Sequence, residues 1–405
     1  MALLGAGLVS LPSVAKAEEK ANSAMTALSA TTLSGYVDTS AQWNFGTGNE
    51  RLPDYKFGGP GKADGFNLDV IQLRIEKPLD ESEWAAGYRV DLWFGPDANT
   101  LGTQSLFGSS GSETGTAADF AIRQAYVSLR MPFGNGIDWK IGVFDSILGY
   151  ESVESPNNPN YTRSFGHSIE PQTHTGVLAS YRFNDMISAS VGVANTTGPT
   201  INYRAFGEDG KAESSKTYMA SLAVTMPDNT GFMSGSTLYA GIVNGLNENE
   251  GRADYDNNGT SYYAGATLAT PVTGLRLGAA FDYLDVQNVG GGETWSVAGY
   301  ASFQATEKLS FHARAEYLRD RGQQKFFTTN PSDPGSSTNP DRALGLTATA
   351  QYDLWKNVVS RLELRWDHSL SGQRTWGPTR TNPDESVTGS LKNEVMVAAN
   401  IIYKF

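Results

Sequence analysis

The chain has 405 residues, 44 glycines, no cysteine and a formal net charge of −12. This charge argues against nucleic acid as a partner, because binding to phosphates relies on Lys and Arg. Hydrophobic residues make up only 39%, and the sequence has no run of eighteen apolar residues, which excludes membrane-spanning helices.

Residues 1–17 have the features of a signal peptide. An apolar run covers residues 2–14, and residues 15–17 (Ala-Lys-Ala) provide a small-x-small cleavage site. No Lys or Arg precedes the apolar run, so we expect its n-region to be truncated. An N-terminal core strand is the alternative. We interpret residues 18–30, which are polar and rich in alanine, as a periplasmic linker or short helix.

From residue 33 onward, apolar and polar side chains alternate along short segments, which is typical of strands with one apolar and one wetter face. Residues 33–45 and 66–75 are the first two such segments. In the second, the parity changes between Val70 and Ile71, which predicts a β-bulge. Fourteen further strands are predicted at residues 84–94, 120–131, 137–146, 174–183, 187–194, 218–226, 237–243, 262–269, 275–283, 295–303, 309–318, 344–354, 358–366 and 393–405.

The last strand runs to the final residue. Its apolar side chains share one parity and end on the aromatic pair Tyr403 and Phe405. A strand that closes the chain on a terminal aromatic residue resembles the last strand of bacterial outer-membrane β-barrels, where it serves as an assembly signal. Taken alone, this segment would equally suit an amphipathic edge strand of a soluble sandwich.

The connections alternate between short and long. Short turns follow the even-numbered strands and long loops follow the odd-numbered strands, and aromatic residues gather at strand ends. This is the arrangement of a barrel with both termini in the periplasm, with aromatic girdles at the two interfaces. We therefore expect an all-β fold: a single domain at residues 31–405, forming a transmembrane antiparallel up-and-down β-barrel of about 16 strands.

The loop at residues 151–173 is the first candidate for a functional element. It carries charged side chains stiffened by three prolines. The segments GVFDSILGYE, PNNPNYTRS and IEPQTHTG, within residues 142–176, resemble the β-barrel porin family called OmpL-like, with weaker likeness elsewhere, notably RQAYVSLR at residues 123–130. The layout is also similar to sixteen-stranded trimeric porins.

That resemblance implies that the loop folds inward and sets the pore size, although the acid-rich motif of the trimeric porins is absent. The constriction residues would be Glu151, Glu154, Arg163, His167 and Glu170. The alternative is that the loop packs against a neighbouring molecule or caps the barrel mouth.

The lumen wall facing this loop is predicted from strand parity to carry both signs of charge. Its residues are Arg74, Arg89, Arg130, Lys140, Asp69, Asp91 and Asp138. Arg123 has the parity of the lipid-facing residues, so we do not assign it to the lumen wall. A second mixed group on two later strands comprises His312, Arg314, Glu316, Arg361, Glu363, Arg365 and Asp367. Both groups suit either a selectivity role or pairing that keeps the barrel rigid.

Two further motifs are weak. Asp254, Asp256 and Asn258 match the first half of a calcium loop, but position 12 is Gly265 in place of the required Glu. A hydrophilic turn is the competing interpretation, and no other cofactor is expected. Ser146 lies in a segment that superficially resembles an esterase box, but it falls within a strand, not on a strand-to-helix turn.

These patterns favour an outer-membrane porin, not an enzyme. We expect a water-filled channel for passive diffusion of small hydrophilic solutes and ions, surrounded by outer-membrane lipid and assembled as a homotrimer by resemblance. The acidic long loops predict weak cation selectivity. A substrate-specific channel and a non-conducting structural or adhesive barrel are the alternatives. Conductance of the purified protein would distinguish a channel from a non-conducting barrel.

Overall fold

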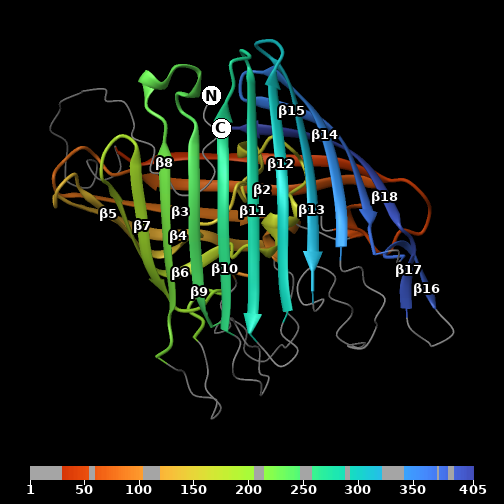
Figure 1. The fold of residues 1–405 in the computed structure, drawn as a ribbon, viewed down its shortest axis with the longest axis horizontal. Coiled ribbons are helices and arrows are strands. Elements are labelled where there is room, and N and C mark those ends of the chain that lie inside the picture. The colour runs from red at the N-terminus through yellow and green to blue at the C-terminus, as the bar shows by residue number, and fades with distance from the viewer. Residues whose placement is uncertain are drawn as a thin grey trace.

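The computed structural model describes residues 30–53, 60–103, 119–204, 214–246, 258–287, 292–321, 342–371, 374–381 and 387–405. Within these residues the chain forms a closed antiparallel barrel of sixteen strands, in which each strand pairs with its neighbours in sequence and the first pairs with the last. The predicted fold class is confirmed. In Figure 1 the strands of the near and far walls cross, because strands in a closed barrel are tilted against its axis.

The elements have the following bounds. The barrel strands are β1 Thr32–Asn44, β2 Gly65–Lys77, β3 Ala85–Phe94, β4 Phe120–Met131, β5 Ile137–Asp145, β6 Thr173–Arg182, β7 Ile187–Ala194, β8 Thr217–Thr225, β9 Thr237–Leu246, β10 Asn258–Ala269, β11 Leu275–Gln287, β12 Gly292–Gln304, β13 Leu309–Asp320, β14 Arg342–Trp355, β15 Val358–Ser369 and β18 Asn393–Lys404. The remaining elements are η1 Pro60–Lys62, η2 Pro96–Thr100, η4 Ser155–Asn157, α2 Phe165–Ile169, η5 Asp228–Met233, β16 Trp376–Thr381 and β17 Val387–Leu391.

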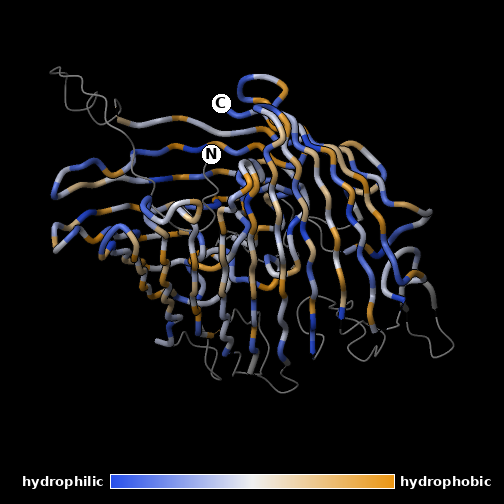
Figure 2. The backbone as a smooth tube through the Cα atoms, turned by 45° about the horizontal axis from the view of Figure 1, so that its top comes forward, coloured by the Kyte–Doolittle hydropathy of each residue, from blue (hydrophilic) through white to orange (hydrophobic). Residues whose placement is uncertain are grey.

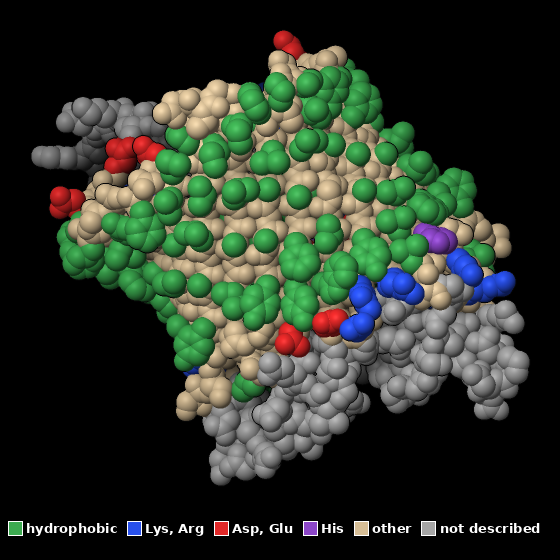
Figure 3. All heavy atoms as spheres, viewed as in Figure 1, with side chains coloured by type: hydrophobic (Ala, Val, Ile, Leu, Met, Phe, Trp, Pro, Cys, Tyr) green, Lys and Arg blue, Asp and Glu red, His purple; other side chains and the backbone are tan. Residues whose placement is uncertain are grey.

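The two-residue period of the sequence becomes the two faces of the wall. In β15, Leu362 and Leu364 are exposed on the outside, whereas Arg361, Glu363 and Arg365 are buried inside. Figure 2 shows the same alternation of hydropathy along the strands, and Figure 3 shows hydrophobic side chains covering the outer wall, with charged groups at its rims. No helix among the described residues is long and apolar enough to cross a membrane.

Both ends of the barrel chain lie beside the short turns. Thr32 pairs with Glu76 next to the turn between β2 and β3, and the N–H of Gly35 donates to the carbonyl of Phe405 at 2.9 Å. The shortest turn, between β14 and β15, contains only Lys356 and Asn357. The predicted arrangement of short turns at one end and longer connections at the other is confirmed for most of the barrel. The exception is the connection between β11 and β12, residues 288–291, which is shorter than the turn between β8 and β9, residues 226–236.

Two β-bulges in the wall of β2 to β4 change which side chains point inward. In β2 the register jumps from Asp38↔Val70 to Thr39↔Leu68, so the bulge lies at Asp69, one residue before the predicted position.

The second bulge was not predicted. In β4, Gln124 pairs with Asp91 and Ile122 with Leu92, which leaves Arg123 as the additional residue. A bulge places two successive side chains on one face, so Arg123 points into the barrel, where it is 1% exposed. The assignment of Arg123 to the lipid-facing side was wrong, because simple parity counting fails at a bulge.

The hairpin of β16 and β17 lies outside the barrel sheet and was not predicted. It belongs to the last long connection. Trp376 at its start is buried against Phe165, Leu318 and Ala343, and Gly377 forms a backbone β-bridge with Arg51 of the first long connection. The first and last long connections are thereby joined above helix α2.

Candidate functional site

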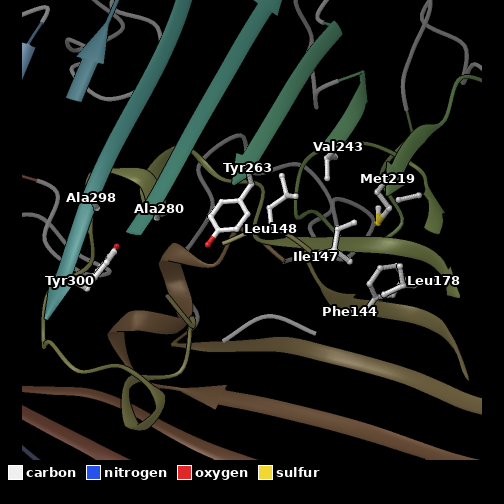
Figure 4. Packing of buried hydrophobic residues seen from close by; sticks show 11 residues of the cluster. Phe144, Ile147, Leu148, Leu178, Met219, Val243, Tyr263, Ala280, Ala298 and Tyr300 are labelled. Atoms are coloured by element: carbon white, nitrogen blue, oxygen red, sulfur yellow. The ribbon is translucent and has the colours of Figure 1, made fainter. Parts of the chain in front are cut away.

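The connection between β5 and β6, residues 146–172, lies inside the barrel. The N–H of Ser146 donates to the carbonyl of Gln172 at 2.9 Å and closes the neck of this loop. Just beyond the neck, Ile147 and Leu148 pack in a buried cluster with side chains from the walls. Figure 4 shows these two residues beside Val243 of β9.

The loop then reaches the wall that faces β5, the strand before the loop. The ring of Tyr150 stacks on Tyr300 of β12 with 4.1 Å between centroids. The hydroxyl of Tyr150 lies so close to Gly278 of β11 that a Cβ there would collide with it. The absence of a side chain at Gly278 therefore makes room for the loop.

Glu154 joins the loop to the wall formed by β2, β3 and β4. Its Oε1 accepts from Arg123 Nη1 at 3.0 Å and Arg89 Nη2 at 3.1 Å, and it also contacts Arg74. Each of these three arginines also binds Asp91 at 2.8 Å. We call these five residues the Glu154 cluster. Arg123, which parity counting had excluded, is its most buried arginine.

On the opposite wall, Arg314 of β13 binds the loop at several points. Its Nη1 donates to Glu151 Oε1 at 2.9 Å and to the carbonyl of Thr162 at 3.0 Å, and its Nε donates to Glu316 Oε1 at 3.0 Å. Glu316 in turn accepts from the backbone N–H of Phe165. Two of these contacts, with the carbonyl of Thr162 and the N–H of Phe165, are made by main-chain atoms of the loop.

Strand β15 continues this pattern. Glu363 accepts from the backbone N–H groups of Tyr161 at 2.6 Å and Thr162 at 2.9 Å, and Arg361 Nη2 donates to the carbonyl of Asn158 at 2.6 Å. We call the wall residues that bind the loop here the β13–β15 anchor. Its members are Arg314, Glu316, Arg361, Glu363 and Arg365.

Arg163 lies within the loop and stiffens it. Its guanidinium donates to the carbonyls of Ser152 at 3.0 Å, Tyr161 at 3.0 Å and Val153 at 3.1 Å. Burial lowers the pKa of Arg163 from its ordinary value. Its own carbonyl accepts from Arg365 Nη1 at 2.7 Å. The predicted constriction residue thus shapes the loop more than it faces a solute.

Helix α2 brings the remaining predicted loop residues together. Ser164 caps it by accepting from the N–H of His167 at 3.2 Å, as expected of a serine at the N-cap position, directly before the first helical residue. Burial lowers the pKa of His167 to about 4. Burial alone would raise the pKa of Glu151, but the guanidinium of Arg314 lowers it below its ordinary value. Glu170 ends the helix beside β11.

The other predicted wall residues lie apart from the Glu154 cluster. Arg130 and Asp138 pair with each other at 2.7 Å, and Lys140 lies over the ring of Tyr126, 5.0 Å from its centroid. Asp69 binds Lys62 at 2.8 Å. Lys62 also contacts Asp97, and its role was not predicted.

A cavity of about 420 Å³ remains between the loop and the wall of β2 to β6. Its lining includes Arg74, Arg89, Lys140 and Asp138, the last of which pairs with Arg130. Side chains of both signs of charge border this cavity.

The calcium candidate falls largely outside the described residues, because Asp254 and Asp256 are not among them. Asn258 begins β10 and accepts from Asn244 at 3.4 Å. Within the described ranges, no cluster of three His, Asp or Glu side chains could hold a metal ion. Ser146 does lie near His174, at 3.3 Å, but both are buried at the loop neck.

Comparison with known proteins agrees with this architecture. Residues 30–405 match the family model described as "Putative beta-barrel porin-2, OmpL-like". No protein of curated function matches.

Among solved structures, the outer membrane channel DcaP of Acinetobacter baumannii is 12% identical, with 93% of this chain and 97% of that chain covered and a TM-score of 0.55. The anion-selective porin from Comamonas acidovorans is 13% identical (93% and 99% covered, TM-score 0.56). The trimer form of OmpT from Vibrio cholerae is 10% identical (93% and 99%, 0.55). At such identities the likeness concerns the fold alone.

Proposed function

Because the chain belongs to the OmpL-like beta-barrel porin-2 family of outer-membrane proteins, we propose that it is a porin through which small hydrophilic solutes and ions diffuse passively. The lumen of a sixteen-stranded barrel is wide enough for an aqueous channel unless something enters it. Here the loop at residues 151–173 enters it, and in our proposal this loop is the constriction.

The observation that carries the proposal is that this loop is held on two sides of the lumen. Glu154 binds the β2–β4 wall, and the β13–β15 anchor binds the loop backbone on the other side. A loop fixed in this way narrows the barrel without needing any domain before the first strand. Solutes would then pass through the cavity beside β2 to β6.

Weak cation selectivity is the second part of the proposal. Seven arginines in the contacts between the loop and its walls are matched by seven carboxylates of the same contacts, so the formal charges of these contacts cancel; Glu170 and Asp282 are additional carboxyls outside them. The arginines are Arg74, Arg89, Arg123, Arg163, Arg314, Arg361 and Arg365. The carboxylates are Asp91, Asp145, Glu151, Glu154, Glu316, Glu363 and Asp367.

With a balanced constriction, the acidic long loops dominate the field. Acidic groups at a channel mouth favour cations, and their influence reaches only about 10 Å at 0.1 M salt. Selectivity should therefore be weak and should fade as salt rises. A substrate-specific channel is the second candidate, favoured by the lone placement of Lys140 over Tyr126 in the cavity wall.

The assembly and the N-terminal segments complete the proposal. We expect a homotrimer, supported by the trimer form of the similar OmpT structure. Residues 1–17 would be removed as a signal peptide, and residues 18–30 would form a periplasmic linker before the barrel.

Single-channel recording in a planar bilayer tests these proposals. Stepwise conductance is expected, with a reversal potential under a KCl gradient that favours K⁺ modestly at low salt and less at high salt. A folded, heat-modifiable barrel that never conducts would identify a structural barrel instead. Clear anion preference at low salt would contradict the proposed selectivity.

A further inference from the structure

Two carboxyl groups meet where the loop returns to the wall. Glu170 ends helix α2 on the loop side, and Asp282 of β11 projects from the wall against Gly166, one helical turn before Glu170. Each carboxyl packs closely against a glycine of the loop, because a Cβ at Gly166 would collide with Asp282 Oδ2 and a Cβ at Gly149 would collide with Glu170 Oε2. Two glycines of the loop thus leave room for the acid pair.

Among the described residues, this pair has no positively charged partner. Among the ion pairs of the described residues, none includes Glu170 or Asp282, in contrast to the other loop contacts. The ionisable groups that face the two carboxyls are Glu151 from the start of the loop and Tyr263 from β10. Burial, together with the Asp282 carboxylate, raises the pKa of Glu170 well above its ordinary value.

Two carboxylates in contact cannot both stay ionised without a strong repulsion, so a hydrogen bond between them requires a proton. We propose that Glu170 and Asp282 form a proton-dependent latch, which holds the end of helix α2 against β11 when a proton is shared and releases it when that proton is lost. The guanidinium groups of the other loop contacts keep their charges over the same range.

The direction of the pH dependence follows from the linkage between proton binding and docking of the loop. A carboxyl whose pKa is raised in the docked state favours docking at low pH, and this contribution is lost as pH rises from the ordinary carboxyl value through the raised one. For a single proton, each pH unit within that window lowers the ratio of docked to released loop about tenfold. The latch is therefore closed in acid and opens toward alkaline pH.

The first readout is unitary conductance from pH 5 to pH 9, which we expect to rise with pH. In Asp282→Asn and in the double variant Glu170→Gln/Asp282→Asn, which retain a hydrogen bond without a shared proton, conductance should become independent of pH. Glu394→Gln is the matched control, since Glu394 is a buried acid of β18 bonded to Asn44 and not to the loop. Its pH response should equal that of the native protein.

The second readout does not require conductance, which matters because the inference rests on the proposed channel function. The chain has no native cysteine, so Ser168→Cys in α2 can be labelled with a thiol reagent and compared with Thr273→Cys in a short turn. The labelling ratio should rise with pH, and Asp282→Asn should abolish that rise. A flat ratio in the native background overturns the latch, whereas a rising ratio without any conductance overturns only the channel.

Discussion

The loop is bound to its two walls in different ways. At the β2–β4 wall, one loop side chain, Glu154, meets three arginines, two of which have side chains that are 19% and 20% exposed to the cavity. At the β13–β15 anchor, buried wall side chains bind main-chain atoms of the loop. The first attachment depends on one side chain, whereas the second depends on the path of the backbone.

This difference indicates which part of the constriction can be adjusted. A substitution at Glu154 alters the charge beside the cavity but leaves the loop held on the other side. A substitution in the β13–β15 anchor leaves buried charges and backbone groups without partners, which is expensive in free energy. The Glu154 cluster is suited to tuning permeation, and the anchor is suited to holding the loop.

The largest effect is expected from removing the anchored segment. Deletion of residues 156–166 should raise unitary conductance, because this segment carries the backbone atoms that the anchor binds. Planar-bilayer recording measures the change, with heat-modifiability confirming that the barrel is folded. A folded deletion variant with native conductance would mean that the loop does not limit flow.

Within the anchor, Glu363→Ala tests the backbone attachment alone. Glu363 accepts three hydrogen bonds from Tyr161 and Thr162 and a fourth from Thr349. Loss of a buried charged partner typically costs about 3–5 kcal/mol. Denaturant unfolding in micelles should show destabilisation of this order, and a cost below about 1 kcal/mol would exclude an anchoring role.

The pH dependence of the free energy of unfolding tests the burial of His167 in helix α2. Because the pKa of His167 falls to about 4 in the folded protein, the unfolded chain binds this proton more readily. Stability should thus be full above about pH 6.5 and decline as pH falls toward 4, by up to about 3 kcal/mol from this group. His167→Gln should reduce the slope, measured as the unfolding midpoint between pH 4 and pH 7.

The smallest stability effect and the clearest selectivity effect are expected at Glu154→Gln. This amide keeps the shape but removes one negative charge from the cluster, where the partial exposure of Arg74 and Arg89 limits the loss of stability to about 1–2 kcal/mol. The reversal potential should shift toward anions at low salt. Asp80→Asn, in the exposed turn between β2 and β3, is the control and should not shift it.

The sequence predicted the barrel, its strand number and the sidedness of its connections, because the period of two is a property of neighbouring residues. It also predicted the inward charges of β15, whose alternation is regular. It failed at Arg123, where a bulge breaks the count. The hairpin of β16 and β17 was missed because its residues lie within a connection and have no long alternating pattern.

The partners of the loop could not be predicted for a different reason. The residues that bind each other across the lumen are far apart in the chain, and charge patterns do not specify which arginine meets which carboxylate. The parity analysis gave the correct face for Arg314 and Glu363, but nothing local relates them to Thr162. Three-dimensional closure of the barrel creates these contacts.

The distance along the chain between the loop and its anchor has a consequence for assembly. Tyr161 binds Glu363, 202 residues later, and contacts between residues so far apart form late, because the chain must first lose the freedom of the intervening segment. The loop therefore reaches its final place only when β13 to β15 join the sheet. An intermediate that stalls before these strands has a wider, wetter interior than the finished protein, so insertion of the C-terminal strands both seals the wall and narrows the passage.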